Sequence, residues 1–474
     1  MNNNNFYERE EGETVQREQK TAEADYSCEG MVETESNKRV RSAVALETEE
    51  KNGTDLLEDI LHRNNLNAAW KKVKDNKGAA GIDGMSVDEM LPYLKEHRDE
   101  LLESIQGGWY KPKPVRRVEI PKPDGGVRML GVPTVIDRMI QQAIAQVLEP
   151  IFEKTFSDCS YGFRPGRNAH QAIKQARKYY DEGYTRVVDI DLAKYFDTVN
   201  HDILMDMLRE QVRDKRVLRL IRKFLKSGIM INGLVSTSQE GTPQGGNLSP
   251  LLSNIYLTRF DKMLEERGHK FVRYADDCNI YVKSKRAAER VMTNCVEYLE
   301  GKLKLTVNRK KSSTGSPLRL KFLGFTLCKM GKKTGIRPHN KTWERFKDKL
   351  RELTSRKQAR TIEIILLKLR RYTIGWLAYY SISDMRNRIQ KLNEWLRRRI
   401  RQIFWKQWKK VSAKFRNLQK LGIAKEKAWQ WSNSRLGYWR ISGSWILSTS
   451  LTNKYLESLG YDDISKRYEA LHCA

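Results

Sequence analysis

Apolar side chains recur every three or four positions in two stretches of the first third of the chain, at residues 55–73 and 134–148. This spacing gathers them on one face of a helix, so it predicts two amphipathic helices. Between these stretches lies YKPKPVRRVEIPKPDGGVRML, at 110–130, whose prolines are incompatible with a helix. Its PKPDGG is a turn signal between two runs rich in β-branched and apolar residues, so the segment predicts a basic β-hairpin.

Beyond residue 180, short apolar runs alternate with helical patterns. TRVVDID at 185–191 and KFLGFTL at 321–327 predict strands, whereas the pattern over 201–226 predicts helices. GTPQGGNLSP, at 241–250, predicts a loop that opens a further helix. Strands and helices that alternate in this way predict an α+β core with a central antiparallel sheet.

The stretch FVRYADDCNI, at 271–280, places two aspartates side by side within an otherwise apolar run. Its flanking residues are aromatic or β-branched, and they predict the strands of a β-hairpin with Ala275, Asp276 and Asp277 at the tip. One interpretation is a plain turn, because aspartate tolerates turn backbone well. The other is a site that faces cations, because two adjacent carboxylates repel each other and are costly to bury unpaired.

A third carboxylate favours the second interpretation. Asp191 ends the predicted strand at 185–191, about where a neighbouring strand of one sheet would deliver it beside the hairpin tip. Three converging carboxylates form an oxygen-ligand site suited to Mg²⁺. Two such ions about 3.5–4 Å apart would activate a 3′-hydroxyl group and stabilise a leaving pyrophosphate.

The net charge adds a partner to this picture. The chain has 88 Lys and Arg against 59 Asp and Glu, which gives a formal net charge of +29. Residues 1–50 carry a net charge of −7, so the remaining 424 residues carry +36. Such a field favours nucleic acid as a polyanionic partner over a generally basic soluble protein. The acidic first residues lack apolar periodicity, which predicts a disordered tail over 1–54.

The last third of the chain contains long, basic, helical stretches. Over 392–408 the apolar and aromatic residues fall near one helical face, and basic residues lie largely around the other faces. Such a helix alone is most often only a solvated face, but here it follows a core that bears carboxylates, which favours a nucleic-acid-binding surface. The arginines of this predicted surface are Arg397, Arg398, Arg399 and Arg401.

The cysteines and the apolar runs limit the compartment. Six cysteines are scattered without a CxxC spacing, so the sequence supports neither a disulfide framework nor a zinc ribbon. No apolar run approaches the roughly 18 residues of a membrane span, and the first residues lack the basic and apolar regions of a signal peptide. We therefore expect a cytoplasmic protein with no membrane partner.

Several motifs, in order, resemble one family. DIDLAKYFD, GTPQGGNLSP and RYADD resemble the palm motifs of reverse transcriptases. RRVEIPKPDGGVRMLGVPTV, SYGFRPGRNAHQAI, LTVNRKKSS and KFLGFTL narrow the resemblance to the group II intron-encoded reverse transcriptases and maturases. RRYTIGWLAYYSI, at 370–382, resembles the thumb of that family, also called the maturase or X domain. The resemblance extends from about residue 55 to the C-terminus.

The resemblance implies a right-hand polymerase, an α+β fold with fingers, a palm built on an antiparallel sheet, and a helical thumb. It implies fingers and palm over 55–335, the thumb over 336–412 and a small, helical, basic DNA-binding domain over 413–474. The region after the thumb lacks the paired cysteines and histidines of an HNH-type endonuclease. It therefore resembles the endonuclease-less, class C type, whose members are thought to prime from an existing DNA strand.

The resemblance also implies roles for individual residues in catalysis. Asp191, Asp276 and Asp277 would bind two Mg²⁺ ions and form the catalytic triad. Lys311 would protonate the leaving pyrophosphate, although the adjacent Lys310 leaves the register of this match open.

Other residues are implied in binding the incoming nucleotide. Lys122 and Arg128 would hold its triphosphate, a role that suits their charge and spacing. Gln244 and Gly245 would support the nascent base pair. One of two adjacent aromatic residues would exclude a ribose 2′-hydroxyl group; these are Tyr195, which we prefer, and Phe196.

The function implied is an RNA-directed DNA polymerase that copies RNA into cDNA from a DNA primer during intron mobility. The same protein would act as a maturase, binding the group II intron RNA that encodes it to assist splicing, and would contact target DNA and dNTPs. Two alternatives stay open. The first is a non-catalytic RNA-binding splicing factor, which the three aspartates disfavour. The second is a retron-like or defence-associated reverse transcriptase, which the thumb motif GWLAYY disfavours.

Overall fold

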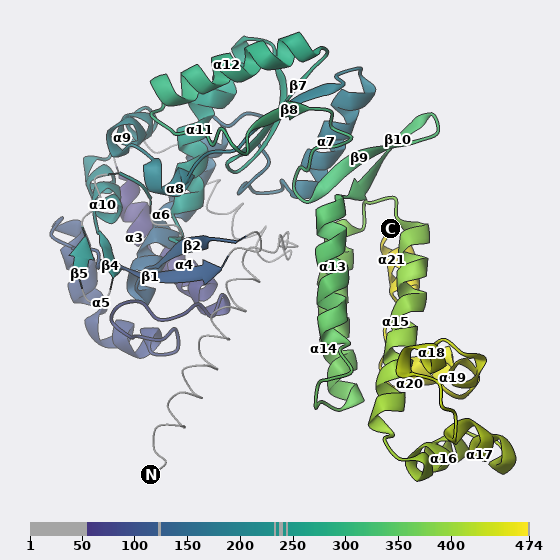
Figure 1. Ribbon diagram of the computed structural model, residues 1–474. Helices are drawn as coiled ribbons and strands as arrows, with labels where there is room; N and C mark the ends of the chain where they lie inside the picture. Colours follow the sequence, from purple (N-terminus) through teal and green to yellow (C-terminus); the bar gives the residue numbers. More distant parts are fainter. Residues whose placement is uncertain (1–54, 122–124, 232–233, 237–239, 243–244, 473–474) are drawn as a thin grey trace. The chain divides into compact units, whose positions relative to one another are not determined.

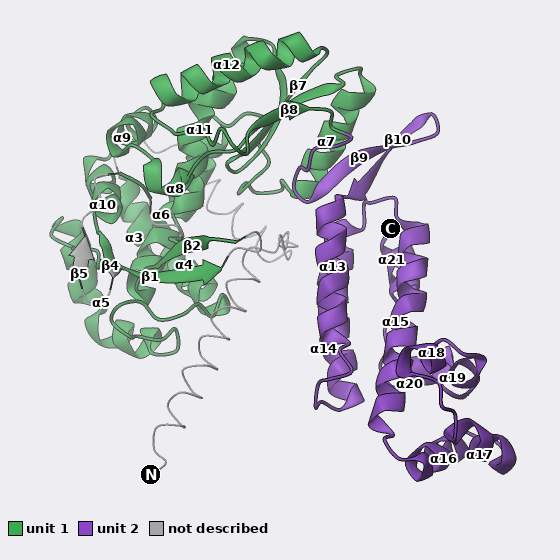
Figure 2. Cartoon of the chain, viewed as in Figure 1, with its two compact units in different colours: residues 1–317 green, residues 318–474 purple. Residues whose placement is uncertain are grey.

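The computed structural model describes the chain except for residues 1–54, 122–124, 232–233, 237–239, 243–244 and 473–474 (Figure 1). The predicted acidic tail therefore lies outside the described residues. The chain divides into two compact units, residues 1–317 and residues 318–474 (Figure 2).

A four-stranded sheet in the first unit carries the basic hairpin. Its strand order is β2–β1–β4–β5. β1 (Val115–Pro121) pairs antiparallel with β2 (Val127–Val132), as the turn signal PKPDGG predicted. β4 (Ile229–Ile231) runs parallel to β1 and pairs antiparallel with β5 (Leu234–Ser236).

A second four-stranded sheet confirms the predicted central antiparallel sheet. Its strand order is β6–β7–β3–β8, and each neighbouring pair is antiparallel. The strands are β6 (Lys270–Tyr274), β7 (Asp277–Val282), β3 (Arg186–Ile190) and β8 (Ser313–Gly315). β3, formed by the apolar run TRVVDID, lies between β7 and β8. The sheet therefore depends on pairing between strands that are far apart in sequence.

Helices pack around these sheets. The described helices of the first unit are α3 (Leu56–Leu61), α4 (Arg63–Asp75), α5 (Met90–Gln106), α6 (Val135–Glu153), α7 (Ala169–Asp181), α8 (Tyr195–Thr198), α9 (His201–Arg209), α10 (Lys215–Leu225), α11 (Ser249–Glu266) and α12 (Lys285–Gly301). The sequence pattern predicted one helix over 55–73, but the structure has two, α3 and α4. His62 has an extended backbone (φ −57°, ψ 136°), and its ring accepts a hydrogen bond from Asn64 N, so it ends α3 and caps α4.

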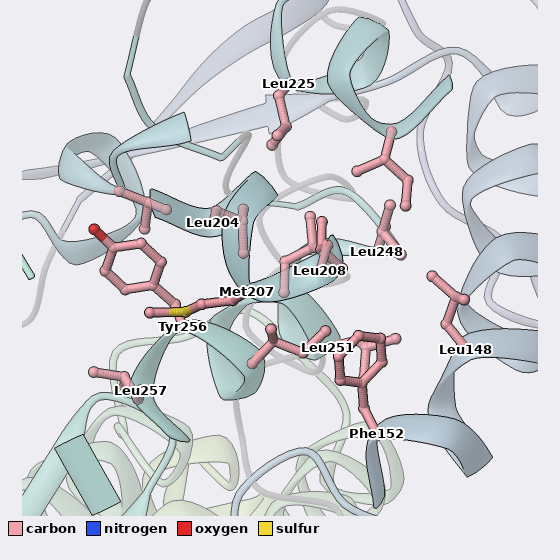
Figure 3. Close-up of a cluster of buried hydrophobic side chains, with 14 of the residues drawn as sticks. Leu148, Phe152, Leu204, Met207, Leu208, Leu225, Leu248, Leu251, Tyr256 and Leu257 are labelled. Carbon is pink, nitrogen blue, oxygen red and sulfur yellow. The ribbon is translucent and has the colours of Figure 1, made fainter. Parts of the chain in front are cut away.

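In the hydrophobic core of the first unit, the β6–β7–β3–β8 sheet packs against the helices. One face of the β6–β7–β3–β8 sheet is buried in it, through residues such as Val188, Ile190 and Ile280. Figure 3 shows part of this core, where side chains from several helices meet. Those it labels are Leu148, Phe152, Leu204, Met207, Leu208, Leu225, Leu248, Leu251, Tyr256 and Leu257. This packing makes the sheet a rigid support for whatever lies on its opposite face.

The second unit begins with a two-stranded sheet and continues as helices. β9 (Phe325–Met330) pairs antiparallel with β10 (Lys333–Pro338). The helices described after it are α13 (Asn340–Leu353), α14 (Ile362–Tyr380), α15 (Arg386–Gln407), α16 (Val411–Lys420), α17 (Lys425–Ser432), α18 (Tyr438–Ser442), α19 (Trp445–Ser450), α20 (Asn453–Ser458) and α21 (Ile464–His472). The long basic helix predicted over 392–408 is part of α15.

The boundary between the two compact units falls at residue 317, and the expected division into fingers and palm, thumb and DNA-binding domain stays a prediction. The β9–β10 hairpin forms a sheet of its own and packs on α14, where Phe325 lies against Tyr380 with ring centroids 4.8 Å apart. Of the strand predicted over 321–327, only the part from Phe325 on is a strand, and it belongs with the helices that follow. Within the described residues, no helix is long and apolar enough to cross a membrane.

Candidate active site

The adjacent aspartates lie at a tight turn between β6 and β7. Tyr274 pairs with Asp277, so the turn itself consists of Ala275 and Asp276. Asp277 is therefore the first residue of β7, not part of the tip as predicted. The turn has two residues instead of the predicted three, because the β6–β7 pairing extends to Tyr274 and Asp277.

The sheet brings Asp191 to the same end. Ile190, the last residue of β3, pairs with Cys278 of β7, and Asp191 follows it directly. Its backbone N–H donates to Ser312 Oγ at 3.0 Å, and its carbonyl accepts from Asn308 N at 2.8 Å. The register thus places Asp191 at the level of the turn, as the sequence pattern predicted.

A fourth carboxylate lies on the same face, and the sequence reasoning missed it. Side chains alternate along a strand, so Asp189 faces the side opposite the core residues Val188 and Ile190, as Asp191 does. Burial and the charge of Asp191 raise the pKa of Asp189 to about 6. The signal in the sequence was the spacing of two in DIDL.

Charge couples the turn to the first sheet. Burial raises the pKa of Asp276, and the negative charge of Asp191 raises it further. Arg128 of β2 and Arg273 of β6 act in the opposite direction through their positive charges. Arg128, predicted to hold a triphosphate, is therefore near enough to Asp276 for its charge to favour the ionised form of that carboxyl group.

These donors fit Mg²⁺ by their chemistry. Carboxylate oxygens are the ligands that Mg²⁺ prefers, and a dication would relieve the repulsion that raises the pKa of Asp276. Within the described part of the chain, no group of three Asp, Glu, His or Cys side chains is arranged as a ready metal site.

Lys311 lies beside this cluster. Its Nζ is 3.7 Å from Asp191 Oδ2, and its side chain is 65% exposed. An exposed ammonium group next to a carboxylate is accessible to a substrate phosphate. Both the choice of Lys311 over Lys310 and the role of Lys311 in proton donation stay predictions.

The two aromatic residues of α8 have different environments. Tyr195 is 2% exposed, and its hydroxyl group donates to the Ser253 carbonyl at 3.0 Å. Phe196 is only partly buried, and its carbonyl accepts a hydrogen bond from Thr242 N at 2.6 Å. The buried ring of Tyr195 and the more accessible ring of Phe196 favour Phe196 as the gate over the preferred Tyr195, and the choice between them stays a prediction.

The loop at 241–250 is described only in part. Lys122 and Gln244, both predicted to contact the nucleotide, lie outside the described residues. Gly245 has a φ of 119°, and a Cβ atom there would lie 2.7 Å from the Gly131 carbonyl oxygen. Only glycine fits this close approach to β2, the strand that carries Arg128.

The arginines predicted to bind nucleic acid on α15 have partners within the second unit. Arg397 Nη1 lies 3.2 Å from Asp463 Oδ2. Arg398 Nη2 donates to the Trp439 carbonyl at 2.8 Å, and its guanidinium group stacks 3.9 Å from the centre of that ring. These contacts hold α18 and the segment before α21 against α15.

The other two arginines also have partners within the second unit. Arg399 Nε donates to Thr354 Oγ1 at 2.6 Å. Arg401, 9% exposed, donates to the Leu451 carbonyl at 3.0 Å and to Asn453 Oδ1 at 2.9 Å. The basic faces expected to be solvated are therefore partly covered: Arg401 is buried, and Arg397, Arg398 and Arg399 are partly buried.

Two families of known proteins match the chain. The family described as reverse transcriptase (RNA-dependent DNA polymerase) matches residues 120–327. The group II intron, maturase-specific domain matches residues 343–422. The first match covers the β6–β7–β3–β8 sheet and the candidate active site and begins near the end of β1, and the second begins in α13 and ends just after α16. Together they confirm the predicted class of fold, a right-hand polymerase with a helical thumb.

Two relatives illustrate how much of the chain is shared. Protein YkfC of Escherichia coli (strain K12) is 37% identical over 277 residues, which cover 50% of this chain and 73% of that protein. Group II intron-encoded protein LtrA of Lactococcus lactis subsp. cremoris is 37% identical over 221 residues, 46% of this chain and 37% of that protein. The chain thus spans well under half the length of the second relative.

Among solved structures, a chain of a partial Cas6-RT-Cas1–Cas2 complex is 23% identical, with a TM-score of 0.34 over 52% of this chain and 42% of that one. This likeness is too low to bear on function. The two domain matches and the relatives are sufficient: the chain belongs to the group II intron-encoded proteins that join a reverse transcriptase, an RNA-directed DNA polymerase, to a maturase domain.

Proposed function

We propose that this chain copies RNA into cDNA from a DNA primer by a mechanism with two Mg²⁺ ions, and that Asp191, Asp276 and Asp277 hold those ions. The observation that carries the proposal is the register of β3 with β7, which brings Asp191 to the turn that bears the adjacent aspartates. The positive charge of Arg128, on the neighbouring sheet, lowers the pKa of Asp276.

Each side chain of the site has a distinct task in this reaction. When bound, Mg²⁺ would activate the primer 3′-hydroxyl group and neutralise charge on the transferred phosphoryl group. Arg128 would hold the triphosphate by charge-assisted hydrogen bonds. Lys311, exposed beside Asp191, would give a proton to the leaving pyrophosphate.

Phe196 would contact the sugar, and Gly245 would let the loop approach the nascent base pair. Lys122 and Gln244 keep the nucleotide-binding roles proposed from the family resemblance.

Removal of the metal tests the enzymatic part of the proposal. The intact protein, given an RNA template, a DNA primer and dNTPs, is expected to make cDNA with Mg²⁺ and none with excess EDTA. Activity should return when Mg²⁺ is restored, because the carboxylates need a dication to act. Intact protein that binds structured RNA but makes no cDNA with Mg²⁺ would instead favour the non-catalytic splicing factor.

We propose in addition that the chain acts as a maturase for its intron RNA, with target DNA as a further partner. A ligand that binds the folded state of an RNA in preference to other states stabilises that fold. The body of the chain carries the strong positive charge needed for such a partner. The basic, tryptophan-rich region over 413–474 is the part we propose for DNA contacts.

The phosphate contacts of the second unit are expected on exposed arginines rather than on the enclosed ones of α15. Arg370 and Arg371 of α14 are both exposed. Replacing both by alanine should reduce the slope of log affinity against log salt concentration by roughly 1.4–1.8, the share of two phosphate contacts. The measurement is RNA binding at a series of salt concentrations.

Arg399→Ala is the matched control for this experiment. It removes the hydrogen bond to Thr354 and should lower the thermal stability while leaving the salt slope of the folded protein unchanged. If Arg399→Ala flattened the slope and the exposed pair did not, the phosphate contacts would belong to α15 after all.

A further inference from the structure

Arg273, three residues before Asp276, is fully buried and makes a set of directed hydrogen bonds. Its exposed fraction is 0%. Nε donates to Asp261 Oδ1 at 2.8 Å, and Nη2 donates to Asp261 Oδ2 at 2.6 Å. Nη1 donates to Asn254 Oδ1 at 3.0 Å and to the Ala275 carbonyl at 2.9 Å. The guanidinium group thus connects α11, which carries Asn254 and Asp261, to the turn formed by Ala275 and Asp276.

The turn that Arg273 contacts has an unusual backbone. Ala275 has a φ of 56°, in the left-handed region that favours glycine. A positive φ suits the first central residue of a tight hairpin turn, but an alanine adopts it only where the surroundings impose it. The hydrogen bond from Arg273 to the Ala275 carbonyl is one such constraint.

A second constraint comes from the segment that precedes α7. A Cβ atom at Gly162 would lie 2.3 Å from Ala275 N, so this glycine lets the backbone pack directly on the turn. Asn254 Nδ2 donates to the Gly162 carbonyl at 2.8 Å, which ties this segment to the same group that Arg273 contacts. Ala275 is thus held from two sides that share Asn254.

We propose that Arg273 is a positioning residue for catalysis: with Asp261, Asn254 and Gly162 it forms a clamp that fixes the Ala275 turn and thereby the carboxylates of Asp276 and Asp277. Arg273 acts through the Ala275 carbonyl and touches no substrate. The inference rests on the proposed function, because the clamp contributes to catalysis only if Asp276 and Asp277 bind the metal.

The geometry distinguishes this role from that of a core ion pair. An ion pair needs only Asp261, and hydrophobic residues of similar volume can often replace a buried pair without loss of stability. Such a replacement would not restore the hydrogen bond to the Ala275 carbonyl. Stability and positioning can therefore be separated by replacing both charged partners at once.

The test uses the double variant Arg273→Met with Asp261→Leu, which leaves no buried charge unpaired, and the single variant Gly162→Ala, which pushes on the turn directly. Gly301→Ala, at a helical glycine with open space around it, is the matched control for the latter. For each protein the measurements are thermal unfolding, the dissociation constant for the RNA template with its primer, kcat for one incorporated nucleotide, and Mn²⁺ affinity by electron paramagnetic resonance.

We expect kcat to fall at least about tenfold in both test variants, because a displacement of about 1 Å at a reacting centre costs up to about 100-fold in rate. The affinity for Mn²⁺ should fall in parallel, whereas template binding and the Gly301→Ala control should match the intact protein.

Folded variants with the kcat and Mn²⁺ affinity of the intact protein would overturn the clamp. If the double variant does not fold, Gly162→Ala decides in the same way. Absence of cDNA from the intact protein is a different result, because it would overturn the proposed function itself and the clamp with it.

Discussion

Replacing Asp276 and Asp277 together by alanine is expected to lower the rate of nucleotide incorporation by at least about a thousandfold, which corresponds to about 4 kcal/mol of transition-state stabilisation. The reason is that metal ions contribute several kcal/mol by stabilising charge at the transferred phosphoryl group, and the variant leaves Asp191 as the one carboxylate of the three. The measurement is single-turnover primer extension on an RNA template with Mg²⁺ and dNTPs.

The double variant should fold and bind RNA as the intact protein does, because Asp277 is exposed and Asp276 only partly buried. Asp181→Ala, at an exposed aspartate near the end of α7, is the control for the loss of a carboxylate elsewhere in the same unit. Full activity of the double variant would mean that the adjacent aspartates form a plain turn. If the intact protein were equally inactive, the chain would be better described as a splicing cofactor.

The strands around this site could be predicted because their signals are local. The apolar runs on both sides of Asp276 and Asp277, and the run that ends at Asp191, show the alternation and the β-branched residues of strands. That these strands are neighbours was inferred from the carboxylates, and the observed pairing of Ile190 with Cys278 agrees with it. The requirement that metal-binding carboxylates lie close together therefore predicted that two strands far apart in sequence are neighbours.

Other features depend on packing that no local pattern contains. The helical pattern over 392–408 showed which face of α15 is apolar, but not that later helices would cover Arg397 and Arg401. In the same way, the sequence gives no sign that Arg273 would be buried. Its partner Asp261 is on another element, and only the folded chain brings the two groups together.

The choice between adjacent aromatic residues was also beyond the sequence. Tyr195 and Phe196 have similar size and lie next to each other in one short helix. A motif match alone therefore does not decide which of the two is the gate. Their ring centroids are 5.3 Å apart at an interplanar angle of 65°. Consecutive helical residues point about 100° apart, which is why the Tyr195 ring is buried in the core and the Phe196 ring is only partly buried.

This difference leads to the second prediction. Phe196→Val is expected to raise the efficiency of ribonucleotide incorporation relative to deoxyribonucleotide incorporation by about 10–200-fold, the range found when a pocket differs by a small group. The smaller side chain would leave room for the ribose 2′-hydroxyl group. The measurement is kcat/KM for one rNTP and the matching dNTP on the same template and primer.

The same substitution at the neighbouring position separates a gate from a core residue. Tyr195→Val should lower the thermal stability, because it leaves a cavity and removes the hydrogen bond to the Ser253 carbonyl. It should leave the preference of the folded protein for dNTPs unchanged. If Tyr195→Val admitted ribonucleotides and Phe196→Val did not, the original preference for Tyr195 would be restored, and the nucleotide would have to approach α8 from the side that now forms the core.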